Sequence, residues 1–278
     1  HIATEGPLGW SALQAARVLR LPVTSDFRTN FQSYSKHYGV GWLHKPILAY
    51  LRKFHNRTLC TMVPTQAMHD QLTNLGFHNL QVVARGVDTQ LFTPDKRSMS
   101  LREQWQADDQ TLVLLSVGRL AAEKNLDLTV KTYHVLKQNN RAVKLVFCGD
   151  GPYRSKLQAD CQDAIFMGMA THAQLALAYA SADLFVFPSL TETFGNVTLE
   201  ALASGTPVLA FDCAAAKEVI EDDLNGWLVP NEDAQRFVLR SLAITQNTST
   251  LKLARAQAAA SIRKWEWSSI ATEAATKF

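Results

Sequence analysis

The sequence predicts an α/β protein made of two units, each with a parallel, doubly wound sheet. Short apolar runs alternate with helical segments along most of the 278 residues. Strands regularly separated by helices imply a parallel sheet with helices on its faces. Several runs, such as 111–117 and 184–187, are apolar throughout, as strands buried on both faces are. Residues 85–95 have few periodic apolar positions, so they predict a linker between the two units.

The first part of the chain, residues 1–95, alternates short strands with helices. Its loop at 4–9 is rich in turn residues, and 10–20 should form a helix, because Leu13, Ala16 and Leu19 share one face. We expect strands beginning at Pro22 and at 60–64 and 81–83, and helices at 43–57 and 66–75. The chain opens on His1-Ile2-Ala3, which has the pattern of the end of a strand. The first unit is therefore expected to be incomplete.

The second part, residues 96–262, repeats the alternation. Strands are predicted at 111–117, 143–148, 164–167, 184–187, 207–210 and 226–229. Helices are predicted between them at 126–138, 153–161, 173–181, 197–204 and 215–220, and two more should fill the C-terminus. This order of strands and helices predicts a second doubly wound sheet.

Composition excludes several classes of protein. The chain is 47% hydrophobic and 19% charged, as expected of a globular protein, and no apolar run is long enough to cross a bilayer. Its net charge of +3 is too small to indicate nucleic-acid binding. The four cysteines are scattered without metal-ligand spacing, and Cys148 in an apolar strand suggests a reduced thiol. We therefore expect a cytoplasmic protein without a metal site.

Two carboxylates, Glu192 and Glu200, follow the apolar run 184–187 and lie eight residues apart. Asn196 or Thr193 can cap the helix that begins between them. Glu192 then lies in the loop at the carboxyl end of a strand, and Glu200 about one turn into the helix. Crevices at such strand ends bind ligands in open α/β sheets, and a helix N-terminus favours an anion. The alternative is that both side chains are solvated and have no ligand.

A second motif, Gly118-Arg119-Leu120-Ala121-Ala122-Glu123-Lys124, directly follows another predicted strand. A glycine turn allows a ligand to approach the backbone, while Arg119 and Lys124 together suit a diphosphate. The segment is not a P-loop, because G-x-x-x-x-G-K is absent. The alternative is an exposed basic loop in which Glu123 pairs with one of the cations.

Two further turns end neighbouring strands. Gly149-Asp150-Gly151-Pro152 lacks the full G-x-G-x-x-G pattern but could form a wall of a nucleotide pocket. The backbone around Met167, in Phe166-Met167-Gly168, could contact the edge of a base.

In this order, these motifs resemble the nucleotide-sugar half of retaining GT-B glycosyltransferases of family GT4. Segments such as Ala203-Ser204-Gly205-Thr206-Pro207-Val208 and Asn225-Gly226-Trp227-Leu228-Val229 are typical of that family. In the first part, Thr4-Glu5-Gly6-Pro7-Leu8-Gly9 and Arg85-Gly86-Val87-Asp88 look like bacterial GDP-mannose-dependent α-mannosyltransferases. The resemblance implies a GT-B fold with two Rossmann-like domains facing a cleft, at 1–95 and 96–262. It also implies a C-terminal helix, 263–278, that returns to the first domain through Trp265 and Trp267.

The resemblance implies a role for each site residue. Arg119 and Lys124 would hold the diphosphate and stabilise the leaving group, so no metal or other cofactor is needed. Glu192 would bind sugar hydroxyls, helped by the backbone near Phe194, Gly195, Asn196 and Val197, and Glu200 would bind the ribose. Gly118, Gly149, Gly151 and Met167 would line the donor site.

The sequence departs from the family pattern in two places. Arg28 stands where many relatives have a histidine that touches the donor sugar, and an arginine cannot act as a base there. The glycine-rich loop that closes over the phosphates in the first domain is missing, which predicts donor binding with little transfer. A UDP-sugar-dependent sulfoquinovosyl or glucosyl synthase, and a binding module without activity, remain the alternatives.

The resemblance implies two partners, the nucleotide sugar GDP-mannose as donor and a lipid or glycan as acceptor. The helix at 43–57 is basic on one side and apolar on the other, so it could contact the inner face of a membrane. The alternative for this helix is an ordinary core face opposite a solvated basic face.

Overall fold

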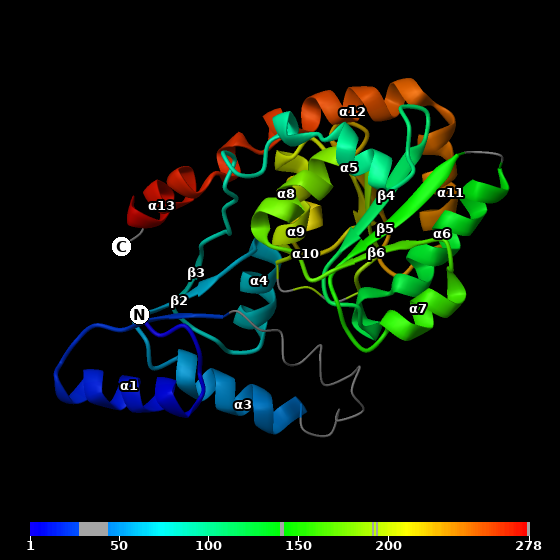
Figure 1. Ribbon diagram of the computed structural model, residues 1–278. Coiled ribbons are helices and arrows are strands. Elements are labelled where there is room, and N and C mark those ends of the chain that lie inside the picture. Colours follow the sequence, from blue (N-terminus) through cyan, green and yellow to red (C-terminus); the bar gives the residue numbers. More distant parts are fainter. Residues whose placement is uncertain (28–43, 140–141, 191, 193, 277–278) are drawn as a thin grey trace. The chain divides into compact units, whose positions relative to one another are not determined.

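The computed structural model describes residues 1–27, 44–139, 142–190, 192 and 194–276 of the chain (Figure 1). Arg28 and Thr193 therefore lie outside the described residues. The chain divides into two compact units. Unit 1 contains His1–Arg85, with short segments that include Glu192, Phe194 and the chain from Glu273 onward, and unit 2 contains the remainder.

Unit 1 contains a parallel three-stranded sheet in the order β1-β2-β3. The strands are β1 (Thr24–Asp26), β2 (Cys60–Val63) and β3 (Leu80–Val82), with helices α1 (Pro7–Val18), α3 (His44–His55) and α4 (Gln66–Asn74). Ile2 forms a single parallel bridge to Ser25 and donates its N–H to the Thr24 carbonyl oxygen at 2.9 Å. The alternation predicted from sequence is thus present in this unit.

The first helix of unit 1 begins earlier than the sequence pattern indicated. We expected a loop through residue 9, but α1 starts at Pro7. Proline is well suited to a first helical position, because the N–H it lacks would have no partner inside the helix. The loop prediction was therefore wrong from residue 7 onward.

Unit 2 contains a parallel six-stranded sheet in the order β6-β5-β4-β7-β8-β9. The strands are β4 (Leu112–Val117), β5 (Val143–Cys148), β6 (Ile165–Gly168), β7 (Leu184–Phe187), β8 (Val208–Phe211) and β9 (Gly226–Val229). The central strand β4 pairs with β5 from Leu112↔Val143 onward and with β7 at Leu114↔Leu184. Every residue of β4, β7 and β8 is buried, which explains their unbroken apolar sequences.

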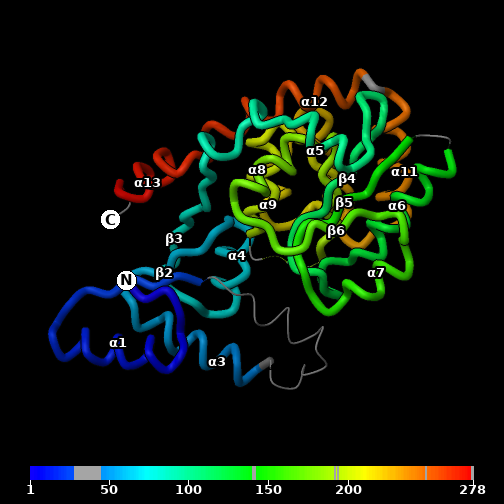
Figure 2. Tube along the Cα trace, in the orientation of Figure 1, coloured from blue at the N-terminus to red at the C-terminus, as the bar shows by residue number. Residues whose placement is uncertain are grey.

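Helices cover both faces of the second sheet (Figures 1 and 2). They are α5 (Met99–Gln104), α6 (Leu126–Gln138), α7 (Arg154–Asp160), α8 (His172–Ser181), α9 (Asn196–Ala203) and α10 (Ala214–Val219). In Figure 2, α6 and α7 lie on one side of the labelled strands, and α8 and α9 on the other. The α6 side carries a continuous core that includes Tyr133, Phe147 and Trp227, all at most 1% exposed.

The C-terminal part of unit 2 contains more helices than the two predicted. Three α-helices follow β9, namely α11 (Ala234–Gln246), α12 (Thr248–Ser261) and α13 (Trp267–Thr276), with a 3-10 turn at Arg263–Trp265. Val87 donates its N–H to the Trp265 carbonyl oxygen at 2.9 Å, and Thr89 donates to Glu266 at 3.0 Å. The Trp267 ring fills the space beside Gly86, where an added Cβ would lie 2.7 Å from it. Among the helices of the described residues, none is both long and apolar enough to cross a membrane.

Candidate functional site

The order of strands in unit 2 places a crevice at one point of its sheet. From β4 the chain proceeds outward to β5 and β6, then returns to the other side of β4 as β7. The loops after β4 and β7 therefore leave the carboxyl ends of adjacent strands in opposite directions. Such topological switch points are where open α/β sheets bind ligands. The Gly118-to-Lys124 motif follows β4, and the segment that leads to Glu200 follows β7.

Three glycines hold the turns after β4 and β5 close together. Gly118 and Gly149 have φ angles of 139° and 134°, which side chains other than glycine rarely adopt. A Cβ at Gly149 would lie 2.0 Å from the Gly118 carbonyl oxygen, and one at Gly151 would lie 2.4 Å from that of Leu120. The close contact between the two loops therefore explains why positions 149 and 151 are occupied by glycine. At Gly118, by contrast, an added Cβ would point into open space.

The two cationic side chains of the motif, Arg119 and Lys124, have different surroundings. Arg119 is exposed, and its guanidinium lies 3.8 Å from the buried carboxylate of Glu123. Lys124 is half-buried, and its Nζ lies 5.7 Å from the centre of the Phe187 ring at the end of β7. The Glu123 carbonyl oxygen accepts a hydrogen bond from the Leu190 N–H at 3.2 Å, which ties the two loops together. The pairing of Glu123 with Arg119 that we considered as an alternative is thus present, between an exposed guanidinium and a buried carboxylate.

Helix α9 begins at the switch point and carries Glu200. Gly195, with φ of 92°, occupies the N-cap, so Asn196 is the first helical residue and the prediction that Asn196 caps the helix was wrong. Glycine has no side chain to accept hydrogen bonds from the first-turn N–H groups. Asn196 is exposed and Val197 half-buried on that first turn.

Glu200 is half-buried one turn further along α9. The Tyr179 hydroxyl on α8 donates a hydrogen bond to its Oε2 at 3.2 Å. Burial raises the pKa of the Glu200 carboxyl, and the hydrogen bond from Tyr179 opposes that rise. Sequence reasoning missed Tyr179; the available signal was a tyrosine within the apolar run 175–180, since buried tyrosines usually have a polar partner.

Glu192 and Phe194 are grouped with unit 1. Glu192 is half-buried and Phe194 is 4% exposed. Arg28, for which we expected a sugar contact, lies outside the described residues. The structure therefore gathers Gly118, Arg119, Lys124 and Glu200 in one unit.

A cavity of about 340 Å³ opens beside the switch point. Residues from the ends of β4 and β5 and from the segment after β6 line it, namely Val117, Gly118, Arg119, Cys148, Gly149, Asp150, Met169, Ala170 and Leu175. Met167, which was expected near the base, lies one strand position before Gly168 and is not in this lining. Within the residues that the structure describes, no group of histidine, cysteine and acidic side chains is arranged to hold a metal ion.

Unit 1 has a larger and mainly apolar cavity of about 540 Å³. It is lined by residues of the loop before α1 and of helix α3, namely Thr4, Glu5, Gly6, Pro46, Ile47, Tyr50 and Leu51. Burial raises the pKa of the Glu5 carboxyl, and the Tyr50 hydroxyl donates to the Glu5 backbone carbonyl oxygen. The sequence singled out this loop only for its resemblance to a family, since no pattern within it predicts a cavity.

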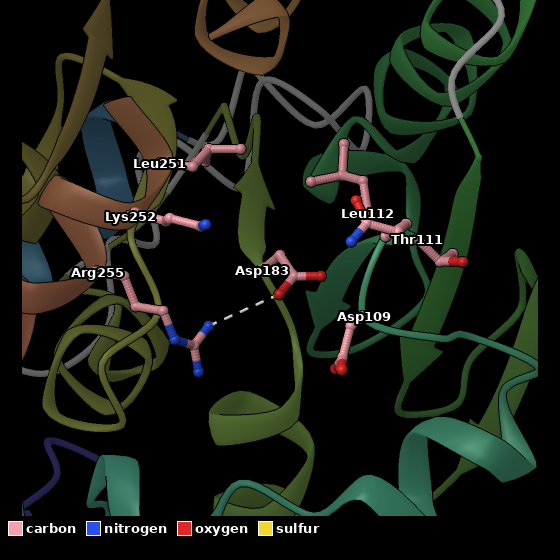
Figure 3. A pocket seen from close by; sticks show the side chains of 8 residues that line it. Asp109, Thr111, Leu112, Asp183, Leu251, Lys252 and Arg255 are labelled. Carbon is pink, nitrogen blue, oxygen red and sulfur yellow. Dashed lines mark ion pairs between the residues drawn. The ribbon is translucent and has the colours of Figure 1, made fainter. Parts of the chain in front are cut away.

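A third cavity, of about 190 Å³, lies at the opposite, amino ends of β4 and β7 (Figure 3). Asp183 at its centre accepts hydrogen bonds from Arg97 at 3.0 Å and Arg102 at 2.9 Å, and Arg255 lies 3.9 Å away. The three arginines also donate to the last carbonyl oxygens of α8 or the residue after it, at Ala180, Ser181 and Ala182. This cluster satisfies a helix C-terminus and anchors the helix that carries Tyr179.

Comparison with known proteins supports this fold. Residues 98–263 match the family model described as glycosyl transferases group 1, and residues 1–91 match that of glycosyltransferase family 4. A GDP-mannose-dependent alpha-mannosyltransferase from Mycobacterium tuberculosis is 36% identical over 230 residues, which cover 83% of this chain and 59% of that protein. The Arabidopsis thaliana sulfoquinovosyl transferase SQD2 is 29% identical over 98% of this chain and 54% of its own length.

Among solved structures, Anabaena HepE in complex with UDP and glucose superposes with a TM-score of 0.82. The superposition covers 99% of this chain and 75% of the HepE chain, and the two sequences are 20% identical. The architecture is that of GT-B glycosyltransferases, as the sequence predicted. The chain belongs to the glycosyl transferases group 1 family, a GT4 family of retaining hexosyltransferases. It spans little more than half the length of the curated relatives that it matches.

Proposed function

We propose that the chain binds a nucleotide-sugar donor at the switch point of unit 2 for transfer of a hexosyl group to a lipid or glycan acceptor, with retention of configuration. The observation that carries this proposal is the convergence of two loops at the carboxyl ends of β4 and β7. One loop supplies Arg119 and Lys124, and the other leads into α9 and Glu200. This arrangement matches the needs of a diphosphate with a ribose attached.

The charges of the crevice suit a departing diphosphate. Cleavage of the sugar–phosphate bond leaves negative charge on the diphosphate oxygens. Arg119 can offer a fork of N–H donors, Lys124 a compact charge, and the start of α9 a partial positive charge. Charges already in place stabilise a developing anion without reorganisation. We propose that Arg119 and Lys124 perform this role without a metal ion.

GDP-mannose is the donor we propose. Support comes from the Mycobacterium tuberculosis relative, whose name specifies that donor and which shares 36% identity with this chain. The second candidate is the UDP-linked sulfoquinovose or glucose that the sequence left open, because the sulfoquinovosyl transferase SQD2 is 29% identical over 98% of this chain. The cavity near Gly149 and Met169 is where the base would lie in either case.

Thermal unfolding with each nucleotide separates these donors. A ligand present at about 100 times its Kd stabilises the folded protein by about 2.7 kcal/mol. We expect GDP to raise the Tm clearly more than UDP at equal concentration, with guanosine as the control without phosphates. A larger shift with UDP would replace GDP-mannose by a UDP-sugar, and no shift with either would refute donor binding.

Glu192 is proposed to bind the sugar rather than the nucleotide. Glu192→Ala should then lower transfer strongly while the affinity for free GDP stays nearly unchanged. Isothermal titration with GDP and an assay of mannosyl transfer measure the two quantities on the same preparation. An equal loss of both would contradict a sugar-binding role.

A lipid acceptor fits the features of unit 1. Its cavity of about 540 Å³ combines apolar walls with the carboxyl of Glu5, as an amphiphile with a hydroxylated head requires. The apolar face of α3 is used inside the unit, where Leu51 and Phe54 are buried, so α3 contacts a membrane only through exposed basic residues such as Lys45 and Lys53. We propose a peripheral contact at the inner face of the membrane, which co-sedimentation with anionic but not zwitterionic vesicles would support.

Transfer by this chain is part of the proposal, because the relatives are longer. The non-enzymatic alternative is a binding module. Continuous release of GDP from GDP-mannose in the presence of acceptor lipid would support transfer. GDP binding without such release would support the module.

A further inference from the structure

The carboxylate proposed to bind the ribose is held by a buried tyrosine. Tyr179 lies on α8, Glu200 on α9, and the Tyr179 hydroxyl donates to Glu200 Oε2 at 3.2 Å. Within the described part of the chain, this is the one hydrogen bond that the Glu200 carboxylate makes. A carboxylate has about four acceptor positions, so one bond to Oε2 leaves most of its capacity for a ligand.

Tyr179 is packed tightly by residues of neighbouring elements. Its side chain is fully buried, and its ring meets Phe92 and Phe185 edge-on, at centroid distances of 6.0 and 5.5 Å. Its backbone carbonyl oxygen accepts a hydrogen bond from the Thr206 hydroxyl. Phe185 belongs to β7, the strand that leads into α9, so the ring is fixed against the element that positions Glu200.

We propose that Tyr179 is a positioning residue that orients the Glu200 carboxylate toward the two ribose hydroxyls of the donor. The inference rests on the proposed function, in which Glu200 binds the ribose. A glutamate side chain has three rotatable bonds, and holding one oxygen removes most of the orientations that a ribose diol cannot use. The same hydrogen bond favours the ionised carboxylate, which accepts two hydrogen bonds from a diol without competing protons.

The alternative is that Tyr179 only fills the core between α8 and β7. Tyr179→Phe separates the two, because it keeps the ring and removes only the hydroxyl. A matched control is Tyr133→Phe, since Tyr133 is equally buried and donates to another carboxylate, that of Asp163, on the α6 side of the sheet. Both variants remove one partly buried tyrosine–carboxylate hydrogen bond from unit 2.

The experiment measures the Kd of GDP and of 2′-deoxy- and 3′-deoxy-GDP by calorimetry for the wild type and both variants. Wild type should prefer the ribonucleotide. Tyr179→Phe should weaken the binding of GDP by about three- to tenfold, the value of one typical hydrogen bond, and should change the binding of the deoxynucleotides much less. Tyr133→Phe should leave all three constants unchanged, and thermal unfolding should show that both variants are folded.

The outcomes distinguish the inference from the proposed function. If the wild type binds GDP and its deoxy forms with equal affinity, Glu200 does not bind the ribose hydroxyls. Both the proposed role of Glu200 and the positioning role of Tyr179 then fail. If wild type discriminates and Tyr179→Phe discriminates equally well, only the positioning role fails. A uniform weakening of all three nucleotides by Tyr179→Phe would likewise assign Tyr179 to packing alone.

Discussion

The carbonyl oxygen of Gly118 lies so close to Gly149 that a Cβ atom there would be 2.0 Å from it. The two glycines end adjacent strands, β4 and β5, and the Gly118 N–H donates to the Cys148 carbonyl oxygen at 3.0 Å. This contact leaves no room for a side chain at Gly149. The pair therefore fixes the floor of the candidate donor site before any ligand is bound.

Gly149→Ala should destabilise unit 2 more than Gly118→Ala does. Both variants acquire strain from a positive φ, of about 1–3 kcal/mol, but only Gly149→Ala adds a backbone clash. We expect Gly149→Ala to lower the free energy of unfolding by about 3–5 kcal/mol in urea titrations. Gly118→Ala should instead weaken GDP binding more than its smaller cost in stability suggests. The reverse order of stabilities would show that the two turns relax apart.

Lys124→Ala should weaken binding of GDP but not of guanosine, because its proposed partner is the diphosphate. A lost charge-assisted contact corresponds to about a 10- to 100-fold higher Kd. Titration calorimetry at two salt concentrations measures the Kd of GDP, and the difference between wild type and variant should be smaller at higher salt. Lys131→Ala, an exposed lysine on α6, provides the control. An equal effect on guanosine would place Lys124 outside the phosphate site.

A buried histidine should make the stability of unit 1 dependent on pH. His55 is fully buried, its Nδ1 lies 3.0 Å from Ser25 Oγ, and the rings of Phe27 and Phe54 pack against it. Burial lowers the pKa of His55 to about 4, although the charge of Asp26 opposes this effect. The folded protein therefore holds the neutral imidazole, whereas the unfolded chain takes up a proton near pH 6.5.

The contribution of neutral His55 to the free energy of unfolding is thus fully present above about pH 6.5. As the pH falls toward 4, the free energy of unfolding should decrease by up to about 3 kcal/mol. Unfolding of wild type in urea should show this loss. His55→Gln can still bond to Ser25, but it has no proton to gain and should show a flatter profile between pH 6.5 and 4. Parallel profiles for the two proteins would mean that other groups cause the dependence.

Asp183→Asn should destabilise unit 2 at the end opposite the candidate site. The Asp183 carboxylate accepts hydrogen bonds from Arg97, Arg102 and the Val113 N–H, and Arg102 is buried. Removing its charge leaves the buried Arg102 guanidinium without its counter-ion, which typically costs about 3–5 kcal/mol. Asp109→Asn, on the same cavity but exposed, should change the free energy of unfolding by less than about 0.5 kcal/mol. Similar values for both variants in urea would refute a structural role for the arginine cluster.

Much of unit 2 could be predicted from sequence because its strands are buried on both faces. The runs at β5, β7 and β9 had the predicted bounds, and helix α6 began and ended at the predicted residues. Boundaries failed where local chemistry outweighs periodicity, as at Pro7, which starts α1, and at Gly195, which takes the N-cap position expected of Asn196. The C-terminal helices were undercounted because the break between α11 and α12 at Asn247 has no glycine or proline to mark it.

By itself the sequence determined the class of fold, the family, and which residues follow the ends of strands, because these depend on local periodicity and on motifs within a few residues. The tertiary structure alone decided which of those loops are neighbours. β4 and β7 lie side by side although β5 and β6 separate them along the chain, and only strand pairing brings Lys124 to Phe187. The tertiary structure also decided that position 149 requires a glycine, because the Gly118 carbonyl oxygen lies against it. It placed apolar residues of α3 in a core and brought the Tyr179 hydroxyl to Glu200. Contacts between residues distant in the chain leave no mark on local spacing, so packing had to supply them.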